Sequence, residues 1–346
     1  MPDIDIRTTG RAGRITLTRP QALNALSYEM CMAIDTALRN WREDDEVNLI
    51  ILDAEGDKAF CSGGDIAELY AAATQGNHSY GQTFWRDEYR LNAMIFEYPK
   101  PVISFLQGFT MGGGVGIGCH GSHRVVCDTS QIAMPECSIG LIPDVGGSLM
   151  LALAPGRLGE YLGTTGHRMG PADAIYAGFA DHYVPRDLWP EVIEMLEASG
   201  SAEPIAQHAQ ALPDSTLKDM QRDIDHYFDG ETLTDIRNML QNNPSDFSEK
   251  ALKALGRNSP LSMAATVEML HRLRSSTLTM RKALEMEYRF TFRATQHSDF
   301  LEGIRAQIID KDRTPKWQHA DGLVPPVAVS KMLQPLGADR LTFEED

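Results

Sequence analysis

Apolar and polar residues alternate in blocks through about residue 185, and the spacing within each block predicts its secondary structure. Residues 15–18 (ITLT) alternate with a period of two, as a half-buried strand does, and Arg19-Pro20 ends this segment. In the following stretch, NALSYEMCMAIDTALRNW, apolar residues recur every three or four positions. This spacing predicts a helix with Asn24 or Ser27 as its N-cap. Further buried strands are predicted at residues 47–54 (VNLIILDA) and 101–108 (PVISFLQG).

Helical patterns separate these strands, so we predict an α/β fold. Helices are expected after Asp65 and at residues 84–97, and a short strand is expected in QIAMPEC. From Trp189 onward the helical pattern dominates. We therefore expect three regions: an α/β domain over residues 1–190, a mainly helical region over 191–325, and a tail over 326–346.

Composition excludes several classes of protein. The chain has 346 residues and a net charge of −16, which argues against nucleic-acid binding because such proteins present basic patches. No apolar run is long enough to span a membrane, and the N-terminus MPDIDIRTTG lacks the apolar core of a signal peptide. The five cysteines are an odd number without a CxxC pair, which indicates reduced thiols and no metal site. We expect a cytoplasmic protein.

Two glycine turns stand out, each at a predicted helix start. Residues 60–66 read FCSGGDI and residues 111–118 read MGGGVGIG. Glycines there can serve close packing, or they can let a ligand reach bare backbone. Two such turns can direct free N–H groups at one carbonyl oxygen that gains charge during a reaction, which is an oxyanion hole. GIGCHG also matches a dinucleotide fingerprint, but the preceding strand ends too early for that interpretation.

The stretches AFCSGGDI and GFTMGGGVGIG resemble the crotonase (enoyl-CoA hydratase/isomerase) superfamily. The resemblance implies a ββα spiral core, an acyl-CoA substrate, no separate cofactor or metal, and a homo-oligomer such as a trimer or hexamer. By position in the motifs it implies that the amides of Ser62 and Gly113 form the oxyanion hole. The remaining turn residues would contact the substrate: Gly63, Gly64, Asp65 and Gly112.

The acid–base groups depart from the hydratase pattern of this superfamily. Hydratases use two glutamates, and the resemblance places one of them at Gly116, where this chain has no side chain. The other corresponds to Glu136 in MPEC. A new carboxylate, Asp144, follows eight residues later across a glycine turn, so both side chains can face one pocket. Two carboxylates beside an oxyanion hole suit thioester hydrolysis, although Asp144 could instead cap the next helix.

The pattern AMPE-x4-LxPDVGG and the later DFLEGIRAQIIDKDRTPKW resemble the 3-hydroxyisobutyryl-CoA hydrolase branch, over roughly residues 5 to 320. The resemblance implies hydrolysis of 3-hydroxyisobutyryl-CoA, a step in valine breakdown. It assigns the lead catalytic role to Glu136, an assisting role to Asp144, and a place in the substrate pocket to Glu88. Whether Glu136 attacks the carbonyl or activates water stays open.

Two other functions remain as alternatives. An enoyl-CoA hydratase or isomerase would need only Glu136, with Asp144 playing a minor part. A scaffold without activity would bind acyl-CoA or a protein partner and need neither carboxylate. The histidines near the second turn, His120 and His123, have no G-x-S-x-G elbow to serve and are interpreted as structural.

Overall fold

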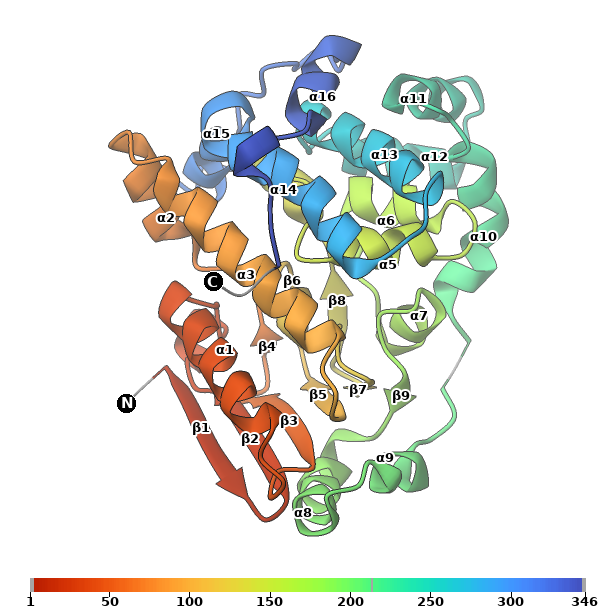
Figure 1. The fold of residues 1–346 in the computed structure, drawn as a ribbon. Coiled ribbons are helices and arrows are strands. Elements are labelled where there is room, and N and C mark those ends of the chain that lie inside the picture. Colours follow the sequence, from red (N-terminus) through yellow and green to blue (C-terminus); the bar gives the residue numbers. More distant parts are fainter. Residues whose placement is uncertain (1–2, 213, 344–346) are drawn as a thin grey trace. The chain divides into compact units, whose positions relative to one another are not determined.

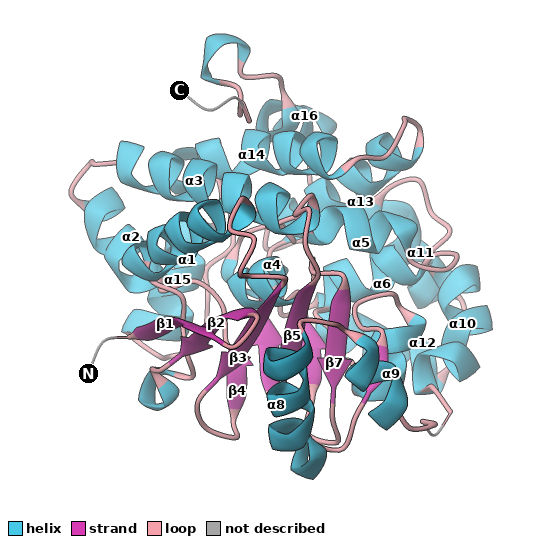
Figure 2. Cartoon of the chain, turned by 60° about the horizontal axis from the view of Figure 1, so that its bottom comes forward, coloured by secondary structure: helices cyan, strands magenta, loops and turns pink. Residues whose placement is uncertain are grey.

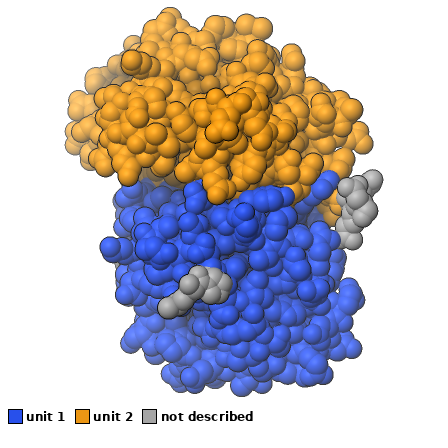
Figure 3. All heavy atoms as spheres, turned by 90° about the vertical axis from the view of Figure 1, so that its left-hand side faces the viewer, with its two compact units in different colours: residues 1–65, 90–133, 168–218 blue, residues 66–89, 134–167, 219–346 orange. Residues whose placement is uncertain are grey.

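The computed structural model describes residues 3–212 and 214–343. They form two compact units, and each unit draws on three separate stretches of chain. Among the described residues the last strand ends at Tyr183 and every later element is helical. The two compact units do not follow a boundary at this point in the chain. The first unit holds residues 1–65, 90–133 and 168–218, and the second holds 66–89, 134–167 and 219–346 (Figure 3).

The first unit contains a six-stranded sheet in the order β1-β2-β3-β5-β7-β9 (Figures 1 and 2). The first two strands are antiparallel, and every other pair is parallel. All six residues of β3 are buried, as expected for a parallel strand covered on both faces. The strands are β1 (Ile4–Thr9), β2 (Ala12–Leu17), β3 (Leu49–Ala54), β5 (Val102–Leu106), β7 (His123–Val126) and β9 (His182–Tyr183).

A second, three-stranded parallel sheet lies in the same unit and carries the two glycine turns. Its order is β4 (Ala59–Cys61), β6 (Phe109–Met111) and β8 (Gln131–Ala133). Each glycine turn directly follows one of the paired strands β4 and β6. Because the carboxyl ends of neighbouring parallel strands meet at one edge, the pairing brings the two turns together.

Helices cover the large sheet, and their caps and apolar faces follow the sequence pattern. Ser27 caps α1 by accepting the amide of Met30, which decides between the two predicted caps. Trp189 on α8 packs against Phe105 of the sheet at a ring distance of 5.0 Å. The helices that lie wholly in this unit are η1 (Pro20–Ala22), α1 (Tyr28–Arg42), α4 (Gly113–Gly118), α7 (Pro171–Tyr176), η3 (Arg186–Leu188), α8 (Trp189–Ser199) and α9 (Glu203–His208).

Every regular element among the described residues of the second unit is a helix. The predicted tail is partly a docked helix, since α16 contacts α13 and α14 and buries Met332 and Leu333. Residues 344–346 lie outside the described residues. The elements are α2 (Ile66–Thr74), α3 (Ser79–Phe96, up to Tyr89), η2 (Glu136–Ile139), α5 (Gly147–Leu153), α6 (Leu158–Thr165), α10 (Thr216–Tyr227, from Asp219), α11 (Leu233–Asn242), α12 (Asp246–Leu255), α13 (Pro260–Arg274), α14 (Met280–His297), α15 (Phe300–Ile304), the π-helical η4 (Arg305–Ile309), α16 (Pro326–Leu333) and η5 (Gly337–Asp339).

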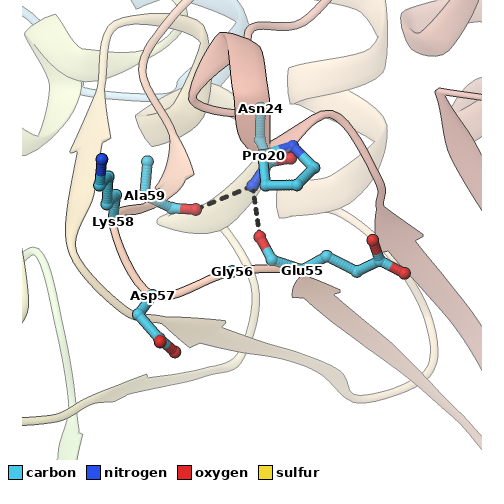
Figure 4. Close-up of a pocket in the computed structure, with 7 residues that line it drawn as sticks. All are labelled: Pro20, Asn24, Glu55, Gly56, Asp57, Lys58 and Ala59. Atoms are coloured by element: carbon cyan, nitrogen blue, oxygen red, sulfur yellow. Dashed lines mark hydrogen bonds between the residues drawn. The ribbon is translucent and has the colours of Figure 1, made fainter.

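Asn24 fixes the loop between β3 and β4 beside a hollow of about 300 Å³ in the first unit. Its buried side-chain amide donates to the carbonyls of Glu55 (3.0 Å) and Ala59 (2.9 Å), shown as dashed lines in Figure 4. Asn24 has a φ of 53°, a left-handed conformation that asparagine tolerates better than most residues. The bonds therefore hold the chain that leads into β4 and the first glycine turn.

All five cysteines are free and buried, which agrees with the expectation of reduced thiols. Within residues 3–212 and 214–343, no helix has the length and apolar character needed to cross a bilayer.

The close packing of α4 against β4 leaves no room for a side chain at Gly114. A Cβ atom at Gly114 would lie 2.3 Å from the carbonyl oxygen of Cys61, a backbone atom that cannot move aside cheaply. We expect Gly114→Ala to lower the free energy of unfolding by about 2–4 kcal/mol. At Gly170 a Cβ would meet nothing within 4 Å, so Gly170→Ala should change it by less than about 1 kcal/mol. Urea unfolding measures both, and equal midpoints would contradict the packing.

Candidate active site

The first glycine turn follows β4 and runs beside the segment that precedes α1. The amide of Ser62 donates to the carbonyl of Leu23 at 3.0 Å. A parallel bridge then pairs Leu26 with Gly64: Leu26 donates to Gly63 (2.9 Å) and Asp65 donates back to Leu26 (2.8 Å). In such a bridge the N–H of the central residue points away from the partner strand. The amide of Gly64 is therefore directed to the other side of the turn.

The second glycine turn follows β6 and opens α4. Gly112 has φ 50° and ψ −120°. Only glycine adopts this conformation readily, so this position requires glycine. Its carbonyl accepts the amides of Val115 (2.8 Å) and Gly116 (3.2 Å). Gly113 is the first helical residue, so its amide has no partner within the helix.

The two turns are neighbours in the first unit. A Cβ on Gly63, which has φ +118°, would lie 3.4 Å from the carbonyl oxygen of Met111 and 4.0 Å from the amide nitrogen of Gly113. The sequence prediction of Ser62 as an oxyanion donor conflicts with its hydrogen bond to Leu23, which already uses that amide. We therefore replace Ser62 by Gly64 as the predicted partner of Gly113. The carboxylate of Asp65 accepts Arg19 at 3.1 Å, which anchors the end of the turn.

Four buried carboxyl groups form a cluster in the second unit. Glu88 lies on α3, Glu136 begins η2, Asp144 precedes α5, and Glu287 lies on α14. Their exposed fractions are 3%, 4%, 4% and 0%, respectively. The structure thus brings together the three carboxylates predicted from the sequence and adds Glu287, which the sequence analysis missed. We call these four residues the acid cluster.

Some carboxyl oxygens of the acid cluster accept hydrogen bonds, and others have no partner among the described residues. The hydroxyl of Tyr89 donates to Asp144 Oδ2 at 2.7 Å and lies 3.3 Å from Thr291 Oγ1. In contrast, Glu88 Oε1 and Glu136 Oε2 are buried without a hydrogen-bond partner among the described residues. Buried polar atoms without partners are rare in folded proteins and commonly mark functional sites. Both oxygens are therefore available to a bound substrate or water.

Burial and mutual repulsion keep protons on this cluster. Burial raises the pKa of Asp144 to about 7, against the hydrogen bond from Tyr89, which lowers it. Burial, followed by repulsion from Asp144, raises the pKa of Glu136 well above its ordinary value. The same causes raise the pKa of Glu88. At neutral pH the cluster therefore holds both protonated and ionised carboxyl groups, which is what acid–base chemistry requires.

The two histidines near the second turn pack against other aromatic rings. His120 is 5% exposed and packs edge-on against Phe96, while His123 stacks on His182 at 6.0 Å. No group of histidine, cysteine and acidic side chains in the described part of the chain has the arrangement of a metal site. Gly116, where the resemblance drawn from the sequence places the second hydratase glutamate, is buried within α4.

Comparison with known proteins identifies the family. A sequence model of the enoyl-CoA hydratase/isomerase family matches residues 12–332, and the chain belongs to this family. A crystal structure described as an enoyl-CoA hydratase from Rhodobacter sphaeroides is 55% identical, covers 99% of this chain and 100% of that one, and has a TM-score of 0.95. A structure described as a carnitinyl-CoA dehydratase from Mycobacterium thermoresistibile is 38% identical, with full coverage of both chains and a TM-score of 0.94. The predicted crotonase-like α/β fold is confirmed.

Curated relatives point to one branch of the family. The mitochondrial 3-hydroxyisobutyryl-CoA hydrolase of Rattus norvegicus is 39% identical over 330 residues, which cover 92% of this chain and 85% of the relative. The enzyme of the same name from Gallus gallus is 36% identical over 329 residues, with the same coverage. The resemblance drawn from the AMPE and PDVGG motifs is thus confirmed.

Proposed function

We propose that this chain hydrolyses the thioester of 3-hydroxyisobutyryl-CoA to 3-hydroxyisobutyrate and CoA. The observation that carries the proposal is the pairing of Glu136 with Asp144 in one buried cluster, with glycine at the position of the second hydratase glutamate. The curated relatives that share most of the chain are named as hydrolases of this substrate. The pairing supplies two carboxyl groups of different proton affinity for that reaction.

In the proposed reaction the amides of Gly64 and Gly113 bind the thioester oxygen as it gains negative charge. Glu136 acts on the carbonyl carbon by one of two routes. It attacks directly, which forms a mixed anhydride and releases the CoA thiolate, and water then hydrolyses the anhydride. Alternatively it takes a proton from water, whose oxygen attacks the carbon. In both routes a proton must reach the departing sulfur, and Asp144, with a pKa of about 7, can hold it.

The test is thiol release from 3-hydroxyisobutyryl-CoA, followed with a thiol-reactive dye. Hydration of crotonyl-CoA, followed by loss of the enoyl absorbance, runs in parallel. Release of thiol without hydration supports the hydrolase. Hydration without thiol release would favour the alternative, because the two similar solved structures are described as a hydratase and a dehydratase. Acetyl-CoA and 3-hydroxypropionyl-CoA as further substrates define the acyl preference.

Tyr89 should set the pH above which the enzyme loses activity. Asp144 loses its proton above its pKa of about 7, so a reaction in which it supplies the proton to the departing sulfur slows down as the pH rises through about 7. The Tyr89 hydroxyl stabilises the carboxylate, so Tyr89→Phe should move this limb of the kcat profile about one pH unit higher. The profile is measured between pH 5 and 9. Tyr98→Phe, which removes a hydroxyl bonded to the Leu38 carbonyl, is the control and should leave the limb in place. An unshifted limb in Tyr89→Phe would exclude Asp144 as its origin.

The remaining expectations about this chain are proposals as well. We expect no cofactor besides the CoA of the substrate, a trimer or hexamer, and a cytoplasmic location. The names of the curated relatives place those enzymes in mitochondria. Light scattering on the purified protein measures the oligomeric state directly.

A further inference from the structure

Glu287 is a buried carboxyl group to which the proposed reaction assigns no step. It lies on α14 and is 0% exposed. Its Oε2 accepts the amide of Gly146 at 2.9 Å. Its Oε1 accepts the amide of Ser148 at 3.1 Å and also the hydroxyl of Ser148. Both oxygens are therefore bonded to the turn that directly follows Asp144.

That turn is strained. Val145 has φ +53° and Gly146 has φ +81°. The left-handed region is a genuine outlier for a β-branched residue such as valine and costs on the order of 1–3 kcal/mol. Such a backbone persists only where its surroundings hold it. Backbone bonds run from the amide of Gly147 to the carbonyl of Asp144 at 2.7 Å and from the amide of Leu149 to the carbonyl of Gly146 at 3.1 Å, and the two oxygens of Glu287 hold the amides of Gly146 and Ser148.

The direction of the Asp144 side chain depends on this conformation. If Val145 relaxed to a negative φ, the peptide that joins it to Asp144 would rotate, and the bond from Tyr89 to Asp144 Oδ2 would be lost or remade elsewhere. We propose that Glu287 is a positioning residue: it holds the Val145–Gly146 turn through the amides of Gly146 and Ser148 and thereby fixes Asp144 for thioester hydrolysis. The role of Glu287 in fixing Asp144 for catalysis rests on the proposed function, whereas its role in holding the turn does not.

A carboxyl group at position 287 is energetically unfavourable, because burial disfavours its charged form. Burial raises the pKa of Glu287 to about 8, although its bonds from Ser148 and Gly146 lower it. In its ionised form Glu287 also raises the pKa of Glu88 and of Glu136. A neutral amide of the same size would avoid this repulsion, but it carries only one oxygen and cannot accept the N–H groups of both Gly146 and Ser148. The need for two acceptors explains the carboxyl group.

The test compares Glu287→Gln with Glu285→Gln. Glu285 lies on the same helix and is 41% exposed, where it pairs with Arg289, so its variant removes a charge from α14 without touching the turn. Hydrogen exchange at the amides of Gly146 and Ser148 reports the turn, circular dichroism reports the folded fraction, and kcat and KM are measured on 3-hydroxyisobutyryl-CoA. In Glu287→Gln we expect exchange about tenfold faster or more at these two amides. We also expect kcat about 10²-fold lower per folded molecule, with KM within about threefold of the original protein. Glu285→Gln should match the original protein.

Unchanged exchange at both amides would overturn the proposal, and so would a kcat that falls only with the folded fraction. If Glu287→Gln does not fold, Glu287→Asp replaces it, because a side chain one methylene shorter keeps two acceptors but cannot reach both amides. Its exchange and kcat should then change in the same directions, and unchanged values would again refute the inference. If the original protein releases no thiol, the proposed function fails, while the exchange measurement still decides whether Glu287 holds the turn.

Discussion

Replacing Glu136 with glutamine is expected to abolish thiol release from 3-hydroxyisobutyryl-CoA at any useful rate. Glutamine keeps the size of the side chain but neither attacks a carbonyl carbon nor accepts a proton. The size of the loss separates the two routes, because removing a general base costs about 10²–10⁴-fold in kcat and removing a nucleophile about 10⁶-fold. Thiol release at saturating substrate measures it. A loss below about tenfold would contradict the assignment of Glu136.

The same variant should be more stable than the original protein above neutral pH. Glu136 is protonated more readily in the folded state than in the unfolded chain, because burial raises its pKa. Its contribution to stability is therefore complete below the unfolded pKa and is lost as the pH rises through the folded pKa. Glutamine removes this loss, and we expect a Tm several degrees higher, about 2–4 °C per kcal/mol recovered.

Glu160 is a matched control in the same unit, because its pKa is lowered where that of Glu136 is raised. Burial raises its pKa, but hydrogen bonds from His271 and Arg274 outweigh burial and bring the pKa down to about 2. This carboxylate stabilises the fold above the unfolded pKa, and that stability is lost as the pH falls through about 2. Glu160→Gln should therefore lower the Tm at pH 8, where Glu136→Gln raises it. Shifts of the same sign would contradict the charge states assigned here.

Replacing Asp144 with asparagine is the second change with a large expected effect. Asparagine keeps an oxygen for the Tyr89 hydroxyl but cannot carry the proton that the departing sulfur needs. We expect kcat for thiol release to fall about 10²–10³-fold, with little change in KM. An isomerase that needs only Glu136 would be spared. A kcat within about fivefold of the original protein would remove Asp144 from the proposed mechanism.

Local patterns in the sequence predicted most of the elements in the structure. The helix over residues 28–42, its cap Ser27 and the buried strand at 49–54 each follow from spacing within one segment. The approach of Glu136 to Asp144 was also predictable, because only eight residues with a glycine turn separate them. Such features depend on neighbours in the chain, and the sequence shows neighbours directly.

Features that depend on distant segments were missed. Glu287 lies 141 residues beyond Gly146, its hydrogen-bond partner, and nothing in MEYRFTF marks it as different from the charges around it. Tyr89 lies 55 residues before Asp144. Likewise, the choice between Ser62 and Gly64 as donor depends on the pairing with Leu23 and Leu26, which no motif in FCSGGDI contains. Only tertiary pairing decides which polar groups remain free.

The interleaving of the two units has a consequence for how the protein folds on the ribosome. Strands β2, β3, β5, β7 and β9 occupy neighbouring places in chain order, so the large sheet can grow at one edge as the polypeptide emerges. The second unit has no such route, because residues 66–89 and 134–167 meet most of their partners only when residues 219–346 have been made. At usual translation rates that wait is on the order of ten seconds. During it the apolar faces of α5 and α6 lack their native partner α13, which makes these nascent segments natural clients for chaperones.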